Sequence, residues 1–522
     1  MEFQINHDIE FTTDEALVNR ARAIEIAKYH TLVAPKTYSK TKSEEGSFSL
    51  VASYPEEGVL LAAKNASLFD FGDHCVGRFQ IELVSEGSPP DAPAKIYLYF
   101  GETLDEVMRD PKTYQGELSS SWIQEELLTV DVLPQTINLQ RRFAFRYVYL
   151  EVVDTSPKYC LRIKLTCRTE SSANEEKIEP LDSKDELLNQ IDFISQKTLA
   201  HCMQDVFEDG PKRDRRLWLG DLRLQALANY HTFKENDLVK KCLYLFAAKT
   251  TNKGQVAANV FVKPELIPDD TFLADYSLFF IDTLLDYYKE TGDETTLQEL
   301  YPVALAQKNV LSDFVSLSGK IDMPDGWWAF IDWNDQLDKQ VAIQGVFIYA
   351  YKRLLELTIS ANPDDEALIS ELQDNTATME EWTLTHSYDK NRCLFLDPES
   401  NQLSVHSQAW MVLAQVGDSR FRKQVLTSLL MLPKGEALSC VSPYMYHHFV
   451  EALFQEDLRE EAIRLLKEYW GGMILAGADT FWEVYQPDDL ALSPYGDAMI
   501  NSYCHAWSCT PCYLLRKYGV ET

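Results

Sequence analysis

The chain has 522 residues, of which 45% are hydrophobic and 12% aromatic, so it can bury more than one core and we expect two domains. Its 81 Asp and Glu residues outnumber 49 Lys and Arg residues, and the formal net charge of −32 argues against nucleic acid or an anionic membrane surface as a partner. The sequence has no apolar run long enough to cross a bilayer and no basic, apolar leader at its N-terminus, which predicts a cytoplasmic protein.

Residues 1–170 are predicted to form a β-sandwich domain. Short runs of alternating apolar residues indicate strands, and turn sequences such as Gly72-Asp73 separate them. Many short strands without intervening helices favour a sandwich over a βαβ fold. The segment 14–29 is ambiguous, because it is rich in Ala, Arg and Leu and could be one helix packed ahead of the sandwich. The clearest strand patterns occur at 94–100, 143–153 and 161–165.

Residues 171–184 contain little that is apolar and are predicted to be a linker. From 185 to 522 helical periodicity dominates, and short connections make successive helices antiparallel. About twelve such helices predict six hairpins closed into an all-α (α/α)6 barrel, with a solenoid as the alternative. The predicted helices cover 185–206, 221–232, 236–249, 271–291, 295–316, 341–359, 365–387, 403–416, 420–432, 444–455, 458–470 and 498–517.

The stretch 209–221 concentrates three carboxylates, four basic side chains and Trp218 where an apolar helical pattern ends. Gly210-Pro211 punctuates the helix, so the carboxylates lie on a loop. Asp221 falls near the start of the next helix, where it could cap the backbone amides. A helix cap with solvated ion pairs would explain this stretch alone, but clustered carboxylates are also what the cleavage of a sugar requires.

Three further segments of the helical half combine tryptophan with acidic or histidine side chains. Flat aromatic faces beside carboxylates suit the C–H faces and hydroxyls of a sugar. The alternative is that the tryptophans only fill the centre of the barrel. The segments are Gly326-Trp327-Trp328-Ala-Phe-Ile-Asp332-Trp333, Thr480-Phe-Trp482-Glu483 and His505-Ala-Trp507.

Ten cysteines are spread along the chain, which fits reduced buried thiols better than a disulfide framework. Cys509-Thr-Pro-Cys512 has the spacing of a redox motif, but it lies in an apolar run that we expect to be helical. His447 and His448 are adjacent and cannot face one ligand from a helix, and no His-Glu-x-x-His motif occurs. We therefore expect neither a metal nor another cofactor.

Taken in order, these segments resemble the motifs of the α-L-rhamnosidases of glycoside hydrolase family 78. The resemblance spans about residues 185–520 and implies an (α/α)6 barrel that hydrolyses terminal α-L-rhamnosyl linkages with inversion, without metal or organic cofactor. The family motif Asp-x-Pro-x-Arg-Glu-Arg-x-x-Trp-x-Gly-Asp is matched at Asp209, Pro211, Arg213, Arg215, Trp218, Gly220 and Asp221. The Asp-Trp, Thr-x-Trp-Glu and His-Ala-Trp motifs are similar to Asp332-Trp333, Thr480-Phe-Trp482-Glu483 and His505-Ala-Trp507.

Carried over position by position, the resemblance makes Asp214 the general acid and Glu483 the general base. Inversion needs an acid that protonates the leaving oxygen and an opposed carboxylate that activates water. The family usually has Glu at the acid position, so Asp214 departs from the motif by one methylene group. The same carry-over gives sugar contacts to Asp209, Arg213, Trp218, Asp221, Trp333 and His505, and pocket walls to Asp332, Trp482 and Trp507.

Two alternatives to an inverting glycosidase stay open. One is different chemistry on the same barrel, such as a phosphorylase, an isomerase or a hydrolase for another deoxy sugar; a phosphorylase needs basic side chains near Glu483, and the loop 476–485 has none. The other is a catalytically degenerate carbohydrate-binding protein, against which the presence of Glu483 argues. The expected partner is a small carbohydrate or rhamnosylated glycoside, and the oligomeric state is left open.

Overall fold

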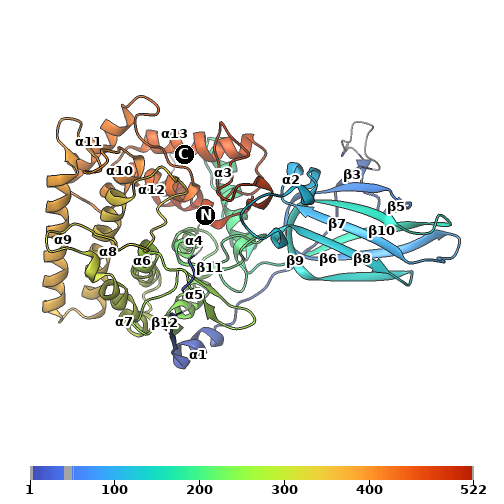
Figure 1. Cartoon of the computed structure of the whole chain (residues 1–522), viewed down its shortest axis with the longest axis horizontal. Helices are drawn as coiled ribbons and strands as arrows, with labels where there is room; N and C mark the ends of the chain where they lie inside the picture. The colour runs from blue at the N-terminus through green and yellow to red at the C-terminus, as the bar shows by residue number, and fades with distance from the viewer. Residues whose placement is uncertain (1–3, 7, 40–49, 51, 520–522) are drawn as a thin grey trace.

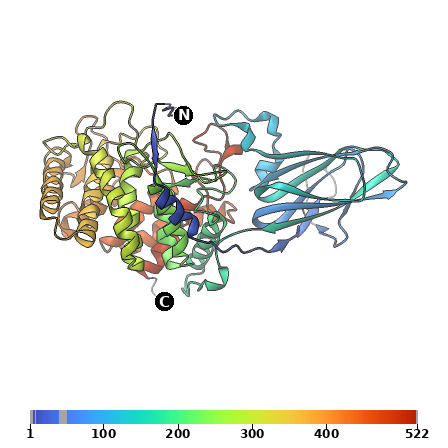
Figure 2. The same ribbon diagram turned by 90° about the horizontal axis from the view of Figure 1, so that it is seen from below.

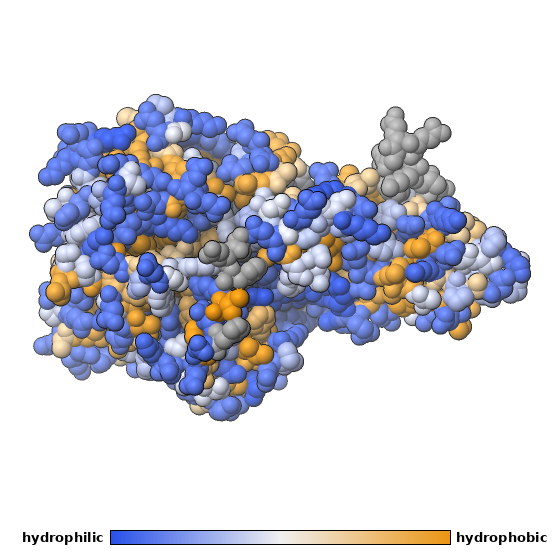
Figure 3. Space-filling view, viewed as in Figure 1, coloured by the Kyte–Doolittle hydropathy of each residue, from blue (hydrophilic) through white to orange (hydrophobic). Residues whose placement is uncertain are grey.

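The computed structural model describes residues 4–6, 8–39, 50 and 52–519. A β domain and a helical domain lie beside each other along the long axis of the molecule (Figure 1). The face shown in Figure 3 is largely hydrophilic, with scattered apolar residues of the kind that any folded surface exposes. Among the described helices, none has the length and apolar character that crossing a membrane would require.

The β domain contains nine antiparallel strands joined into one sheet, with β2, β10, β6, β9, β7 and β8 in that order and β3, β4 and β5 paired along it. The strands are β2 (Leu32–Val33), β3 (Thr37–Ser39), β4 (Ala52–Ser53), β5 (Val59–Leu61), β6 (Ala66–Gly87), β7 (Ala94–Gly101), β8 (Gln124–Val130), β9 (Gln135–Asp154) and β10 (Tyr159–Thr169).

The long strands allow this sheet to fold over on itself. The pairing of β6 with β9 shifts register after Asp70 and after Arg78, and such irregularities bend a strand. The inward residues of β6, β7 and β9 then share one core, in which the rings of Phe79, Phe100 and Phe145 pack edge to face. The predicted β-sandwich is confirmed in this form, and Figure 2 shows the strands in two layers.

Between β7 and β8 the chain leaves the sheet as the 102–123 segment, which contains α2 (Leu104–Met108), η1 (Pro111–Thr113) and η2 (Ser120–Trp122). In Figure 1, α2 lies between the strands and the helical domain. This segment is therefore the part of the β domain that can reach the loops of its neighbour.

The helical domain is the predicted (α/α)6 barrel. Contacts between α4, α6, α8, α10, α12 and α14 run from each helix to the next and back from α14 to α4, so these six close an inner ring, and the other six pack around it. The helices are α3 (Glu186–Cys202), α4 (Leu219–His231), α5 (Asn236–Ala248), α6 (Ala274–Thr291), α7 (Glu294–Val310), α8 (Gln340–Ala361), α9 (Glu366–His386), α10 (Val405–Leu413), α11 (Ser419–Leu430), α12 (Pro443–Gln455), α13 (Arg459–Leu475) and α14 (Pro511–Tyr518).

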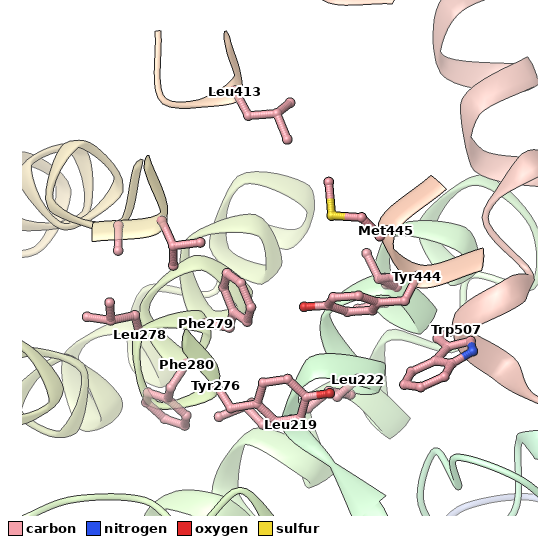
Figure 4. Close-up of a cluster of buried hydrophobic side chains, with 14 of the residues drawn as sticks. Leu219, Leu222, Tyr276, Leu278, Phe279, Phe280, Leu413, Tyr444, Met445 and Trp507 are labelled. Carbon is pink, nitrogen blue, oxygen red and sulfur yellow. The ribbon is translucent and has the colours of Figure 1, made fainter. Parts of the chain in front are cut away.

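Aromatic side chains fill the interior of the inner ring. Figure 4 shows Tyr276 and Phe279 from α6 and Tyr444 from α12 gathered with Leu222 of α4 and with Trp507. All of them are buried. Because full burial of such side chains contributes about 1.5–3 kcal/mol each, this packing fixes the ends of the inner helices on which the candidate site is built.

The predicted helix at 498–517 is wrong over its first half. The helix α14 begins only at Pro511, and the preceding residues form two short turns, η5 (Ala498–Ile500) and η6 (Ala506–Ser508). The backbone between these turns binds another loop instead of coiling, since Ser502 accepts a hydrogen bond from the Glu483 N–H and His505 donates one to Phe481. Proline fits the first turn of a helix, which explains why the helix begins there.

The first residues belong to the helical domain rather than to the sandwich. The helix α1 (Glu15–Ala23) packs on α5, and β1 (Phe11–Thr13) pairs with β12 (Lys249–Thr251). The suggestion that a helix at 14–29 packs ahead of the sandwich is therefore wrong, because the helix packs against the barrel. The Ala, Arg and Leu content indicated a helix, which the structure shows over Glu15–Ala23, but this composition does not determine which domain the helix covers.

Candidate active site

The candidate residues lie at one end of the barrel. Successive helices alternate in direction, so all six inner helices begin at the same end. The loop 209–216 leads into α4, Asp332-Trp333 precede α8, and Glu483 and His505 lie on the long connection before α14. Residues that are ~270 positions apart in sequence thus meet above the inner ring.

The 209–216 loop is closed by its own backbone. The N–H of Asp209 donates to the Arg216 carbonyl, and the N–H of Arg216 donates to Asp209 Oδ1, both at 3.0 Å. Arg215 has φ +59°, a left-handed conformation that non-glycine residues rarely adopt and that costs of order 1–3 kcal/mol. This closed loop presents Arg213 and Asp214 to the site.

Arg213 connects two candidate carboxylates. It donates through one terminal nitrogen to Asp214 Oδ1 at 3.4 Å and through the other to Glu483 Oε2 at 2.5 Å, while Nε donates to the Ile500 carbonyl. Since both terminal nitrogens belong to one rigid guanidinium group, these two carboxylate oxygens lie within about 8 Å of each other. Asp214 is the more accessible partner, with 19% of its side chain exposed against 3% for Glu483.

Glu483 is held from several sides. Tyr495 donates its hydroxyl proton to Oε1, the Ser502 N–H lies 3.3 Å from Oε2, and the Glu483 carbonyl accepts from Trp507 Nε1 at 3.0 Å. Burial raises the pKa of Glu483, but the charge of Arg213 and the hydrogen bond from Tyr495 outweigh it and leave the pKa below its usual value. This carboxylate is therefore ionised at neutral pH.

Asp209 and Asp221 show the opposite behaviour. Burial and the negative charge of Asp214 raise the pKa of Asp209 well above its ordinary value, and burial together with Glu483 raises that of Asp221. Burial also lowers the pKa of His505 to about 4, so its ring is neutral. The site thus combines a carboxylate whose pKa is lowered, Glu483, with two whose pKa values are raised, Asp209 and Asp221.

Several buried polar atoms at this end of the barrel have no hydrogen-bond partner among the described residues, although buried polar atoms normally have one. They come from three segments of the chain, and three of the four lie on residues selected from the sequence. Donors and acceptors in this arrangement suit the hydroxyl groups of a sugar ring. They are Asp221 Oδ1, Trp333 Nε1, Ser502 Oγ and His505 Nδ1.

Comparisons with known proteins agree with this geometry. Residues 53–169 match the N-terminal domain of glycosyl hydrolase family 78 alpha-rhamnosidases, and residues 176–367 match the six-hairpin glycosidase domain of bacterial alpha-L-rhamnosidases. The structure of a rhamnosidase from Klebsiella oxytoca with rhamnose bound is 41% identical, with a TM-score of 0.93, over 98% of this chain and 100% of that one. The chain belongs to glycoside hydrolase family 78.

Two larger rhamnosidases share the fold at lower identity. The Bacillus sp. GL1 enzyme is 20% identical with a TM-score of 0.71, over 87% of this chain and 47% of that one. The Streptomyces avermitilis α-L-rhamnosidase complexed with L-rhamnose is 18% identical with a TM-score of 0.68, over 94% and 43%. A search of curated proteins finds no match.

The tryptophans selected from the sequence differ in what they do. Trp333 is half-buried, packs edge to face on Phe330 and Tyr495, and keeps its indole N–H unpaired among the described residues. Trp218 is also half-buried and lies edge to face with Tyr276. Trp482 and Trp507 are buried in the wall. Trp333 and Trp218 are thus the two that can offer surface to a sugar.

Helix packing explains why a glycine stands at position 220, within the family 78 motif. A Cβ at this position would lie 2.3 Å from the ring of Tyr276, so any other residue would push α4 away from α6. The glycine therefore sets the spacing of two inner helices directly below Trp218 and Asp221.

Asp332 is a structural residue of the loop before α8. Its carboxylate accepts hydrogen bonds from the Val441 and Ser442 N–H groups, from the Ser442 hydroxyl and from His406 Nε2 at 2.7 Å. Burial raises its pKa, but these hydrogen bonds and the charge of His406 outweigh it and lower the pKa. Asp332 therefore ties the Trp333 loop to α10 and α12, and its oxygens are already used.

We expect Asp332→Ala to lower the free energy of unfolding by about 3 kcal/mol or more, because it leaves buried N–H groups and His406 without their acceptor. Urea unfolding followed by circular dichroism measures this. Asp325→Ala, at an exposed position of the same loop, is the control and should stay within about 0.5 kcal/mol of the parent. Equal stability of the two variants would contradict the structural role.

Two contributors to the site were missed from the sequence. Tyr495 contacts Glu483, and Lys212, fully buried, forms an ion pair with Glu106 of the β domain at 2.7 Å and donates to the carbonyls of Met499 and Asn501. A fully buried lysine must have such partners, and the position of Lys212 inside the motif was its one available signal. Nothing in the sequence around Tyr495 marks it.

Two groups of side chains hold donor atoms within 4.8 Å of one another, as a metal site would: His74, His201 and Cys504, and Asp332, His406 and Cys440. Hydrogen bonds already link members of both groups: His74 contacts His201 at 2.8 Å and Glu102 at 3.0 Å, and His406 Nε2 contacts Asp332 at 2.7 Å. His406 Nδ1 is buried and has no hydrogen-bond partner among the described residues.

Proposed function

We propose that this member of family 78 is an inverting α-L-rhamnosidase that removes terminal α-L-rhamnosyl residues, with Asp214 as the general acid and Glu483 as the general base. The observation that carries the proposal is the bridge by Arg213, which brings these two carboxylates to one place and limits the distance between them. The bound sugar in the Klebsiella relative supports rhamnose as the substrate.

The upper limit of about 8 Å overlaps the roughly 6.5–9.5 Å that separates the carboxyl groups of inverting enzymes, where a water molecule fits between sugar and base. It also includes the ~5 Å of retaining enzymes, so the anomer that is released first decides between the two mechanisms. In this mechanism Asp214 protonates the leaving oxygen while Glu483 removes a proton from the attacking water. The lowered pKa of Glu483 supports the second role, because a base must be ionised.

The remaining groups would bind the sugar. Asp209 and Asp221, whose pKa values are raised, can accept hydrogen bonds and in their protonated form also donate them, and Trp333 can pack on the ring while its N–H meets a hydroxyl. The neutral His505 beside Asp221 at 3.6 Å adds a further donor and acceptor. In this mechanism the guanidinium group of Arg213 binds the two carboxylates, so it is not free to donate paired hydrogen bonds to neighbouring hydroxyl groups of the sugar.

The structure bears on the phosphorylase alternative, which requires a basic side chain near Glu483. A basic group does contact Glu483, but it is Arg213 from the 209–216 loop and not a residue of 476–485. Arg213 already binds Glu483, Asp214 and a backbone carbonyl and stacks on Tyr495, 4.3 Å from the ring centre. Phosphate would have to displace the base from this cation, which favours hydrolysis.

We expect the chain to release L-rhamnose from p-nitrophenyl α-L-rhamnoside and to leave the α-L-arabinoside, β-D-galactoside and α-L-fucoside essentially intact. Inversion predicts that β-L-rhamnose appears first in proton NMR and then equilibrates with the α-anomer. Initial formation of the α-anomer would contradict inversion. Sugar 1-phosphate formed only when phosphate is present would favour the phosphorylase instead.

A further inference from the structure

The loop that carries Tyr495 is held by the β domain. The carbonyl of Tyr495 accepts a hydrogen bond from the Glu117 N–H at 2.9 Å. Two residues later, the carboxylate of Asp497 accepts both terminal nitrogens of Arg109, at 2.8 and 3.1 Å, and the Gln115 N–H at 3.2 Å. These partners all come from the 102–123 segment, and a bidentate Arg–carboxylate pair is the more specific kind of ion pair.

The contact between the domains is also apolar. Val107 and Ile123 of the 102–123 segment share one buried cluster with Tyr495, Met499 and Ile500 of the helical domain. Trp333 packs against the same cluster. The position of the Tyr495 ring is therefore fixed by packing from the β domain as well as by hydrogen bonds.

At the other end of this chain of contacts lies Glu483. The Tyr495 hydroxyl donates to Oε1, while the Tyr495 ring lies under the Arg213 guanidinium that binds Oε2. One side chain thus contacts one oxygen of the carboxylate directly and the cation on its other oxygen. A carboxylate fixed in this way cannot rotate freely, and a general base needs such a fixed orientation toward its water.

We propose that the β domain positions the general base: the 102–123 segment holds the loop of Tyr495 and Asp497, and Tyr495 orients the carboxylate of Glu483. This inference rests on the proposed role of Glu483 as the base. It makes Tyr495 and Arg109 positioning residues, which act through Glu483 and not on the sugar. It also gives the β domain a function in the reaction, where the barrel alone would otherwise supply every group.

The test is the pH dependence of kcat/KM for p-nitrophenyl α-L-rhamnoside, whose acidic limb reports the pKa of the base in the free enzyme. A donated hydrogen bond stabilises the charged carboxylate, so its removal raises the pKa and moves the limb to higher pH. The charged or titratable groups that face Glu483 are Arg213, Tyr495, His505, Asp214 and Asp221.

For Tyr495→Phe we expect kcat to fall about tenfold with little change in KM, and the acidic limb to move up by about one pH unit, as for loss of one hydrogen bond to a charged group. Arg109→Gln should lower kcat and move the acidic limb to higher pH, both by a smaller amount than Tyr495→Phe. Arg109→Lys should restore part of the lost kcat and part of the shift. The control is Arg141→Gln, which breaks an ion pair with Glu126 of the same domain at nearly the same exposure, 40% against 41%.

An acidic limb that stays in place in both Tyr495→Phe and Arg109→Gln would overturn the inference, as would a change confined to KM or to the melting temperature. If Arg109→Gln does not fold, the Tyr495→Phe profile still decides. Failure of the proposed function is a separate outcome: an active Glu483→Gln enzyme removes the base assignment, whereas an inactive Glu483→Gln with an unshifted Tyr495→Phe profile removes only the positioning role.

Discussion

Glu483→Gln is expected to lower kcat on p-nitrophenyl α-L-rhamnoside by about 10²–10⁴-fold, because the amide keeps the shape of the side chain but cannot remove a proton from water. Rhamnose binding should persist, since the proposed sugar contacts lie on Asp209, Asp221 and Trp333. Steady-state kinetics measures the first effect and isothermal titration calorimetry with L-rhamnose the second.

The matched control for this variant is Glu468→Gln, which removes the charge of an exposed glutamate on α13 that pairs with Arg464. It should behave like the parent, because exposed ion pairs contribute little. Turnover by Glu483→Gln comparable to that of the control would show that another group is the base. If the parent itself binds L-rhamnose with the same affinity as Glu483→Gln and neither releases sugar, the chain is a carbohydrate-binding protein.

Asp214→Asn should slow the hydrolysis of rhamnosides with poor leaving groups by about 10²–10⁴-fold and that of the nitrophenyl substrate far less. Protonation of the leaving oxygen matters most when that oxygen is basic, and nitrophenolate departs with little help. A series of aryl and alkyl α-L-rhamnosides, with log(kcat/KM) plotted against leaving-group pKa, measures this as a steeper slope in the variant.

The comparison that decides the acid is Asp209→Asn. The raised pKa of Asp209 would also suit a proton donor, so the structure provides a real competitor for Asp214. As a sugar ligand, Asp209 should affect all substrates alike through lost transition-state binding. A steep leaving-group dependence in Asp209→Asn and none in Asp214→Asn would transfer the acid role to Asp209.

The barrel could be predicted from the sequence because each helix carries its own apolar periodicity and short connections determine its neighbours. The irregular structure of 498–510 could not be predicted, because the backbone of this segment is hydrogen-bonded to the loop around Glu483. Its apolar residues, which suggested a helix, are buried in the wall of the site. The same long-range contacts place α1 on α5, which no local pattern states.

Some site residues could likewise be predicted from the sequence and others could not. The motifs identified carboxylates that the structure brings together at one end of the ring, and their roles remain predictions. The family resemblance placed Asp332 in the wall of the pocket. Its partners, His406 and Ser442, are 74 and 110 residues away and could not be found from the sequence around it. Tyr495 was missed because its contact with Glu483, 12 residues away, depends on how the irregular connection before α14 folds, and no motif surrounds it.

The two domains look separate in the ribbon (Figure 1), but one buried apolar cluster joins them. It connects Val107 and Ile123 of the β domain to Tyr495, Met499 and Ile500 of the barrel, so each domain contributes to the stability of the other. A barrel expressed without the β domain would expose this apolar surface to water and leave buried Lys212 without its partner Glu106. We therefore expect the two domains to unfold in a single transition, and the barrel to lose stability when the β domain is removed.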